Sequence, residues 1–226
     1  MILRIASLVI SMLLLTAAVP VDAQTSFEDQ VLTELNALRQ NPSAYVEGLL
    51  RYRRYYQANV IVVPSVPVRY LTQEGTAPLD EAIVYLRQQA RRDRLTSAGS
   101  LASAAADHCA DQALNGAVGH VGARGTSPGD RVVRRGGGIY VAEVITYGAN
   151  SPADVIRQLV IDDGVPDRSH RQLLFAYQMR FAGISCGKHP LYRTMCVVDF
   201  ARTPDGRAMA EYAQLDPSVM NRHRKP

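Results

Sequence analysis

The stretch RFAGISCGKHPLYRTMCVVDFAR, from Arg180 to Arg202, decides the fold class. It contains two apolar segments separated by a polar turn, which predicts two strands joined in a hairpin. Upstream of it, helical patterns dominate and strands do not alternate regularly with helices, which disfavours a doubly wound parallel sheet. We therefore expect an α+β domain, in which helices pack in layers on a small, mainly antiparallel sheet.

Apolar residues recur at helical spacing through most of the chain before this hairpin. The pattern predicts a helical region over 26–56, in which Pro42 starts a second helix. A β-branched, Pro-punctuated segment, 60–78, predicts an exposed loop or a short extended piece. The rest of the chain predicts one extended segment over 139–148 and helices over 79–92, 97–116, around Asp130 and over 152–163.

Three cysteines bear on the compartment and on the site. Cys186 and Cys196 flank the predicted turn, where a hairpin would bring them within bridging distance, and secretion would favour a disulfide. Cys109 lies in an Ala-rich helical stretch, where a buried free thiol is the expected role. A nucleophilic Cys109 is the alternative, but no base is obviously placed to activate it, and the sequence has no CxxC zinc spacing.

The N-terminus predicts a secretory signal over residues 1–23. Arg4 precedes an almost unbroken apolar run, Leu8–Ala18, and the segment 21–23 ends in the small residue typical of a cleavage site. The run is shorter than the about 20 residues of a membrane span. A retained anchor is the alternative, but no stable span is expected after cleavage. The expected location is therefore secreted, extracellular or periplasmic.

The chain that remains is long enough for one domain with a sizeable core. We expect a single domain over 24–205 and a polar C-terminal tail over 206–226. The formal net charge of +4 is mildly basic. It suits anionic surfaces such as lipid head groups or wall polymers but falls far short of a nucleic-acid-binding protein. We interpret the arginine clusters at 51–54 and 91–94 as solvated helix faces.

Six short motifs follow one another in an order that one known family shares. LNALRQNPSAY resembles that family's opening helix, and SLASAAADHCADQ resembles its second conserved helix, which leads to Gly119-His120. SPGDRV resembles a loop and short helix, AEVI a segment usually written G-E-N-I, SHRQLLF the bacterial signature S-P-G-H-R-x-x-(I/L)-L, and FAGISC the strand after it. From Val31 to Arg202, the chain thus resembles the CAP superfamily of cysteine-rich secretory proteins, insect venom antigens and plant pathogenesis-related proteins.

This resemblance implies a three-layer α-β-α sandwich with a shallow central cleft, lined by two histidines and two acidic residues. His120 matches the first histidine, Glu143 the first acid and His170 the second histidine. In the family, the second acid is a Glu three residues after a Trp, on the helix before the second histidine. Asp162 takes this Glu position here, and Asp163 is the other candidate.

Three features depart from the family pattern. Asp162 is one methylene shorter than a Glu. The chain has no tryptophan, and Leu159 stands where the family has its Trp. The family's C-N-Y signature is replaced by CVVDFA, Cys196–Ala201, so the metal geometry and the cleft wall both stay open.

The residue types at this cleft point to a metal site. Two converging imidazoles can bind a divalent cation through neutral ring nitrogens, and a carboxylate beside them can ligate or can accept the second ring N–H and fix the tautomer. The set of His120, His170, Glu143 and Asp162 suits Zn²⁺ and also Ni²⁺, Co²⁺ or Cu²⁺. The alternative is a purely structural role, in which the four groups hydrogen-bond across the core and lock a loop without metal.

The favoured function is a secreted binding module. The resemblance implies a sterol, a fatty acid or another apolar ligand, or an extracellular polymer or protein partner. Tyr52, Tyr55, Tyr56 and the segment Val60–Val63 could line an apolar groove for such a ligand, although ordinary core and loop packing is the favoured explanation for them.

The alternative function is a metal-dependent extracellular hydrolase with Glu143 as the base. No H-E-x-x-H motif supports it, and no serine or cysteine is placed with a base in the arrangement of an activated nucleophile. Ser169 precedes His170 directly and is expected to cap the following helix rather than to act as a nucleophile.

Overall fold

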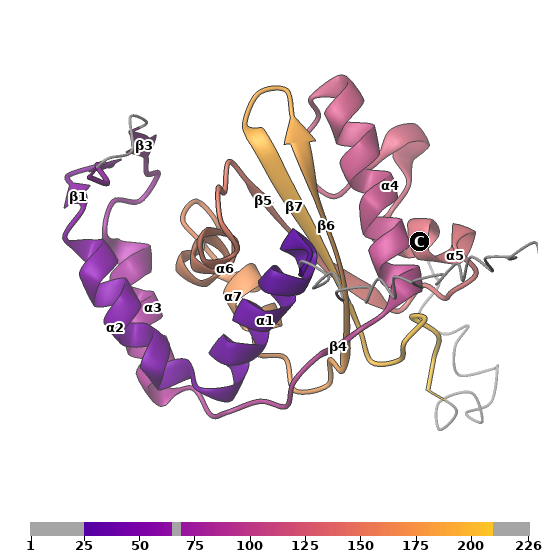
Figure 1. The fold of residues 1–226 in the computed structure, drawn as a ribbon, viewed down its shortest axis with the longest axis horizontal. Coiled ribbons are helices and arrows are strands. Elements are labelled where there is room, and N and C mark those ends of the chain that lie inside the picture. Colours follow the sequence, from indigo (N-terminus) through magenta and orange to yellow (C-terminus); the bar gives the residue numbers. More distant parts are fainter. Residues whose placement is uncertain (1–24, 65–68, 210–226) are drawn as a thin grey trace, which may run out of the picture.

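A four-stranded sheet forms the middle layer of the computed structural model, which describes residues 25–64 and 69–209 (Figure 1). The predicted signal and all but the first residues of the predicted tail lie outside the described residues. β6 and β7 form the predicted hairpin, β5 runs antiparallel to β7, and β4 runs parallel to β6. The strand order is β4 (Thr96–Ser97), β6 (Phe181–His189), β7 (Arg193–Ala201) and β5 (Val141–Tyr147).

Helices cover both faces of this sheet, so the expected three-layer α-β-α sandwich is confirmed (Figure 1). On one face lie α1 (Phe27–Gln40) and α6 (Pro152–Ile161), with α2 (Pro42–Arg53), α3 (Ala77–Gln88) and α7 (Ser169–Leu174) around them. On the other lie α4 (Gly99–Asn115) and α5 (Pro128–Arg134), joined by a loop that contains the short helix η1 (Ala123–Gly125).

Alternation along β7 sends its side chains to opposite faces of the sheet. Val198 and Phe200 belong to the core with α1 and α6, whereas Met195 and Val197 pack with residues of α4. Asp199 has the same parity as Val197 and is fully buried. A carboxyl group therefore lies inside the layer between the sheet and the helices α4 and α5.

The close approach of α4 to β6 explains why the segment FAGISC has a glycine, Gly183, at its centre. A Cβ atom at this position would lie 2.0 Å from the backbone nitrogen of Ala102, at the start of α4. Only glycine lets the helix come this close to strand β6.

The predicted disulfide between Cys186 and Cys196 is confirmed. The two residues are cross-strand partners in the β6–β7 hairpin. Cys196 is buried with the α1-side core, and Cys186 packs against it. The bridge thus ties the two central strands together on that face.

Removing this bridge is expected to destabilise the domain moderately. A Cys186→Ser/Cys196→Ser variant should lose roughly 2–3 kcal/mol of unfolding free energy, because the unfolded chain regains the freedom of a short loop. Urea unfolding measures the loss. Wild-type protein reduced with dithiothreitol should lose a similar amount, and an unchanged midpoint in both samples would contradict the prediction.

The segment expected to be a loop or short extended piece forms a small second sheet. Its antiparallel strands are β1 (Tyr56–Gln57), β2 (Val60–Ile61) and β3 (Tyr70–Leu71). It follows α2 and precedes α3, at the far end of the molecule from α4 (Figure 1). This sheet matters because it carries two tyrosines of the pocket described below.

Cys109 is a free, buried cysteine, as predicted. Its thiol donates to the carbonyl oxygen of Ser185 at 3.2 Å. Burial raises the pKa of this thiol to about 11, so it stays protonated and is a poor nucleophile. Within residues 25–64 and 69–209, no helix is both long and apolar enough to cross a membrane.

Candidate functional site

The loop that carries His120 is held by hydrogen bonds from residues of α4 and β5. The ring of buried His108 lies with Nε2 2.8 Å from the carbonyl oxygen of Gly119, and the amide of Gln112 donates to the same oxygen. The backbone N–H of Gly119 donates to the hydroxyl of Tyr147 at 2.8 Å. These bonds to the N–H and the carbonyl oxygen of Gly119 hold the residue before His120 in place, so His108 positions this loop.

His120 rests on a buried carboxylate. Its Nδ1 lies 2.9 Å from Oε1 of Glu143, whose side chain is 1 % exposed, whereas the imidazole itself is 47 % exposed. The guanidinium of Arg131 donates to Oε2 of Glu143 at 2.5 Å and to the backbone oxygen of His120 at 3.1 Å. Arg131 thus neutralises the carboxylate and also fixes the loop above it.

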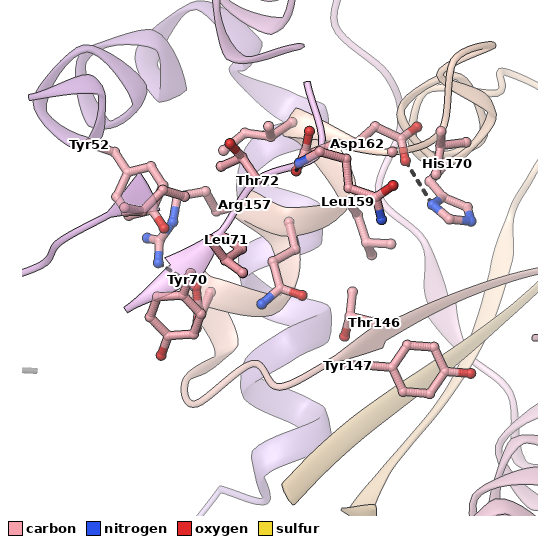
Figure 2. Close-up of a pocket in the computed structure, with 18 of the residues that line it drawn as sticks. Tyr52, Tyr70, Leu71, Thr72, Thr146, Tyr147, Arg157, Leu159, Asp162 and His170 are labelled. Carbon is pink, nitrogen blue, oxygen red and sulfur yellow. Dashed lines mark hydrogen bonds and ion pairs between the residues drawn. The ribbon is translucent and has the colours of Figure 1, made fainter. Parts of the chain in front are cut away.

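His170 lies against Asp162 in an ion-pair contact rather than a hydrogen bond (Figure 2). Nδ1 of His170 lies 2.8 Å from Oδ1 of Asp162, and Oδ2 of Asp162 accepts the backbone N–H of Arg171 at 3.1 Å. Asp162 ends α6 in the left-handed conformation, with φ 62°, which turns its side chain back toward α7. Of the two candidate acids, Asp162 therefore lies against His170.

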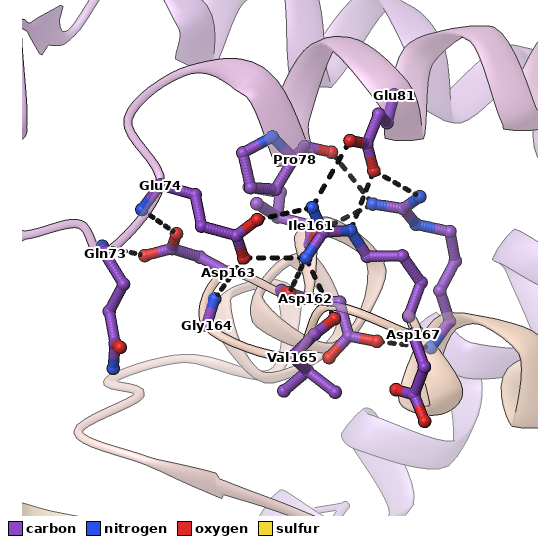
Figure 3. Close-up of polar contacts among 12 residues, drawn as sticks. Gln73, Glu74, Pro78, Glu81, Ile161, Asp162, Asp163, Gly164, Val165 and Asp167 are labelled. Carbon is purple, nitrogen blue, oxygen red and sulfur yellow. Dashed lines mark hydrogen bonds and ion pairs between the residues drawn. The ribbon is translucent and has the colours of Figure 1, made fainter.

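Asp163 has a different role, because it anchors the loop before His170 to the segment between β3 and α3 (Figure 3). Its carboxylate accepts the backbone N–H groups of Gln73 and Glu74 at 2.8 and 2.9 Å. Arg168 strengthens this link through ion pairs with Glu74 and Glu81, each at 2.7 Å. Hydrogen bonding to Arg168 lowers the pKa of Glu74 to about 2, so the link persists at neutral pH.

Arg168 also corrects one prediction from the sequence. The composition of the segment predicts that Ser169 caps the helix that carries His170, but α7 already includes Ser169 and the cap position belongs to Arg168. Arg168 adopts the left-handed conformation, with φ 52°, and makes no side-chain cap bond. Its guanidinium is instead committed to the carboxylates of Glu74 and Glu81.

The two histidine rings lie next to each other, with centroids 6.4 Å apart and planes at 64°. Each ring turns Nδ1 toward a carboxylate. A proton on Nδ1 then leaves the lone pair on Nε2, which is the arrangement by which carboxylates orient metal-binding histidines. His120 and Glu143 therefore form a pair of this kind, and Nδ1 of His170 lies within ion-pair distance of Asp162.

These residues fit a cation only through the two imidazoles. One ion at about 2.0–2.1 Å from a nitrogen of each ring is compatible with rings this close. Glu143 and Asp162 lie behind the rings, at Nδ1, where they orient the ligands. In the part of the chain that the structure describes, no three His, Cys, Asp or Glu side chains are grouped to hold a metal. Further coordination positions would belong to water or to a bound ligand.

Sequence reasoning missed a second carboxyl group under this site. Asp199 on β7 is the cross-strand partner of Glu143 on β5 and is fully buried. Burial raises the pKa of Asp199 to about 8, and the nearby charge of Glu143 adds to this effect. Asp199 therefore keeps its proton at neutral pH and can donate it to Glu143. The sequence offered one signal for Asp199, because it is an acidic residue within the apolar segment predicted as a strand.

The geometry disfavours Glu143 as a general base. Its side chain is 1 % exposed, and its two oxygens are occupied by His120 and Arg131. A base must come within hydrogen-bond reach of the proton that it removes. Glu143 is instead built into the support of His120.

A pocket of about 460 Å³ opens beside His170 (Figure 2). It lies along the free edge of strand β5, between α6 and the small sheet. Tyr52, Tyr56 and Ile61 line it, whereas Tyr55 and the valines of the predicted groove do not. Polar residues that follow β3 or lie on β5 and α6 complete the lining, among them Thr72, Thr146, Asp154, Arg157 and Gln158. The pocket is therefore less apolar than the sequence suggested.

Comparisons with known proteins place this site in a family. The model of the CAP domain, described as the cysteine-rich secretory protein family, matches residues 81–200, which is more than half of the chain. No curated protein sequence matches it.

Two solved structures resemble the chain at 18 % sequence identity. An outer surface protein from Borrelia burgdorferi has a TM-score of 0.40, with 48 % of this chain and 77 % of that chain covered. An extracellular protein containing a SCP domain from Bacillus anthracis str. Ames has a TM-score of 0.42, with 70 % of this chain and 50 % of that chain covered. The matched segment contains the histidine pair, Glu143, Asp162 and Asp199, and the chain belongs to the CAP, or cysteine-rich secretory protein, family.

Proposed function

We propose that this protein is a secreted binding module whose functional centre is the histidine pair together with the pocket beside it. The carrying observation is that two imidazoles lie side by side, each held from behind by a buried carboxylate. Such support orients the outer ring nitrogens without occupying them. The disulfide between Cys186 and Cys196 supports an oxidising compartment.

The histidine pair is proposed to bind one divalent cation through Nε2 of His120 and Nε2 of His170. Zn²⁺ suits two imidazoles, and Ni²⁺, Co²⁺ or Cu²⁺ are the other candidates. Glu143 and Asp162 would hold the rings in the required tautomer. The cation would supply a Lewis-acidic contact for a polar group of the ligand in the pocket.

Zinc titration tests this proposal. Calorimetry of the purified protein should show one site, and a His120→Ala/His170→Ala variant should bind at least 100-fold more weakly, because both protein ligands are gone. His223→Ala, which changes a histidine outside the described residues, is the matched control and should bind like the wild type. Elemental analysis of the purified protein gives an independent readout.

The zinc titration can also contradict the proposed metal site. Equal zinc affinity in the wild type and the double variant, or no binding at micromolar zinc, would leave the two His–carboxylate pairs as loop locks. The binding module would then consist of the pocket alone.

A further inference from the structure

We infer that the pocket beside His170 takes a short neutral saccharide, in preference to a sterol or a fatty acid. This inference rests on the proposed binding function, because it names the ligand class of the same module. Three observations carry it: the tyrosines in the lining, the buried polar atoms without partners, and the charge balance.

Tyrosines of the small sheet reach the pocket. Tyr56 comes from β1 and Tyr70 from β3, and both are partly exposed. Tyr147 of β5 is also in the lining, but its hydroxyl is already bonded to Gln112 and Gly119. One face of a pyranose ring presents C–H groups, which stack on aromatic rings, while the hydroxyl groups at its rim need hydrogen-bond partners. A tyrosine satisfies both needs, because it has an apolar face and a polar end.

The polar side chains of the lining include atoms that lack partners. The hydroxyl oxygens of Thr72 and Thr146 and Nε of Arg157 are buried and make no hydrogen bond within the described part of the chain. Each such group costs about 1–3 kcal/mol when it stays unsatisfied. Thr146 is only 4 % exposed, and its position on β5 places it at the pocket wall. Rotation about χ1 turns a threonine hydroxyl toward a bound group.

These atoms select against a purely apolar ligand. A sterol ring or an acyl chain would leave the two threonine hydroxyl groups and Nε of Arg157 without partners. The hydroxyl groups of a saccharide can donate and accept, so they fit threonine and guanidinium groups at once. Amide groups of Gln73 and Gln158, also in the lining, extend the same recognition.

The charge of the lining disfavours an anionic ligand. Three carboxylates, Asp154, Asp162 and Asp163, line the pocket, against the single guanidinium of Arg157. Arg157 is already paired with Asp154 and lies 4.0 Å over the ring of Tyr52. In the absence of a bound cation, a fatty-acid carboxylate or an acidic sugar would face a net negative wall. The volume of about 460 Å³ is ordinary for a small-molecule site and suits a ligand of few rings.

A binding panel tests the inference. Neutral trisaccharides of glucose and of N-acetylglucosamine are titrated into the protein and followed by calorimetry and by amide chemical shifts, with oleate and cholesterol as apolar competitors. At least one trisaccharide should bind at millimolar concentration or better, with shifts at Tyr70, Thr146 and Arg157. No saccharide binding, or oleate or cholesterol bound with shifts at these residues, would overturn the inference.

Two variants with matched controls sharpen the result. Thr146→Val removes one hydroxyl at nearly constant shape, and Tyr70→Leu removes one ring. Each should weaken saccharide binding about tenfold, whereas the controls Thr33→Val and Tyr177→Leu, on α1 and on an exposed loop, should not. Saccharide affinity unchanged by both pocket variants would contradict the inference. Circular dichroism identifies a variant that does not fold, and the wild-type shifts then decide.

The saccharide result is separable from the metal result. Titrations run with and without EDTA show whether saccharide binding needs a cation. Zinc affinity of Thr146→Val should equal that of the wild type, because Thr146 does not touch either histidine pair. Absence of zinc binding would overturn the proposed metal site and leave the saccharide test intact. Absence of saccharide binding would overturn the inference and leave the zinc test intact.

Discussion

Replacement of Asp199 by Asn is expected to stabilise the protein strongly at pH 8 and very little at pH 4. Asp199 is fully buried, and its pKa rises from 3.8 to about 8, first because of burial and then because Glu143 is near. The unfolded chain ionises this carboxyl above pH 3.8, whereas the folded protein keeps it protonated up to about pH 8. Folding therefore loses stability as the pH rises through this window.

The size of the effect follows from the linkage between pKa and stability. Each pH unit within the window costs about 1.4 kcal/mol from this one group. An Asn side chain has nearly the same shape, carries no charge and can still donate to Glu143. At pH 8, Asp199→Asn should thus exceed the wild type by on the order of 3–5 kcal/mol. Urea unfolding at several values between pH 4 and pH 8 measures the difference.

Asp93→Asn is the control for this series, because the side chain of Asp93 is 78 % exposed. Its stability should follow the wild type at every pH. If the curves of Asp199→Asn and the wild type also ran parallel from pH 4 to pH 8, Asp199 would titrate normally in the folded protein. Asp199 could then not be the neutral neighbour that allows Glu143 to stay buried with its charge.

The protonation of Asp199 also decides where the charge of the site lies. With Asp199 neutral, Glu143 carries the single negative charge of the buried pair, and Arg131 balances it at 2.5 Å. Glu143 can then accept the Nδ1 proton of His120 and keep Nε2 free.

Much of the fold could be predicted because its signals are local. The helical periodicity of α1, α4 and α6 and the alternation of β6 and β7 are written in consecutive residues, and the disulfide follows from the hairpin. The histidines His120 and His170 are identified by ordered motifs, and they do lie together. That His120 and His170 coordinate a metal through Nε2 stays a prediction.

The rest of the site could not be predicted, because it depends on backbone geometry and on distant contacts. Asp162 and Asp163 are neighbours in sequence, and only the left-handed end of α6 turns Asp162 toward His170. Ser169 is a residue type that often caps a helix, but α7 already includes it, and Arg168, which is ion-paired with Glu74 and Glu81, occupies the cap position. The pocket combines segments as distant as Tyr52 and Tyr192, whose proximity no local pattern records.

Replacement of Arg131 by Met is expected to be the most damaging change at the site. The side chains of Arg131 and Glu143 are 2 % and 1 % exposed, so the variant would leave a buried carboxylate without a counter-charge. The carbonyl oxygens of His120 and Thr126 would lose their donor as well. Breaking a buried ion pair on one side typically costs about 3–5 kcal/mol, and we expect a loss of this size at pH 7.

The double variant Arg131→Met/Glu143→Gln tests the cause. It removes both charges, so it should be clearly more stable than Arg131→Met alone, although the loop of His120 still lacks its donor. Urea unfolding of the wild type, both single variants and the double variant gives the coupling energy. Strict additivity of the two single losses would show that Glu143 is not the group that Arg131 neutralises.

Arg135→Met is the matched control, since it removes the same guanidinium just after α5 from an ion pair that is largely solvated. The side chains of Arg135 and Asp107 are 47 % and 32 % exposed, and such surface pairs contribute at most about 1 kcal/mol. A large loss for Arg131→Met beside a small one for Arg135→Met would locate the effect in burial rather than in charge number. Because Arg131 also holds the loop of His120, zinc affinity should fall in Arg131→Met and stay unchanged in Arg135→Met.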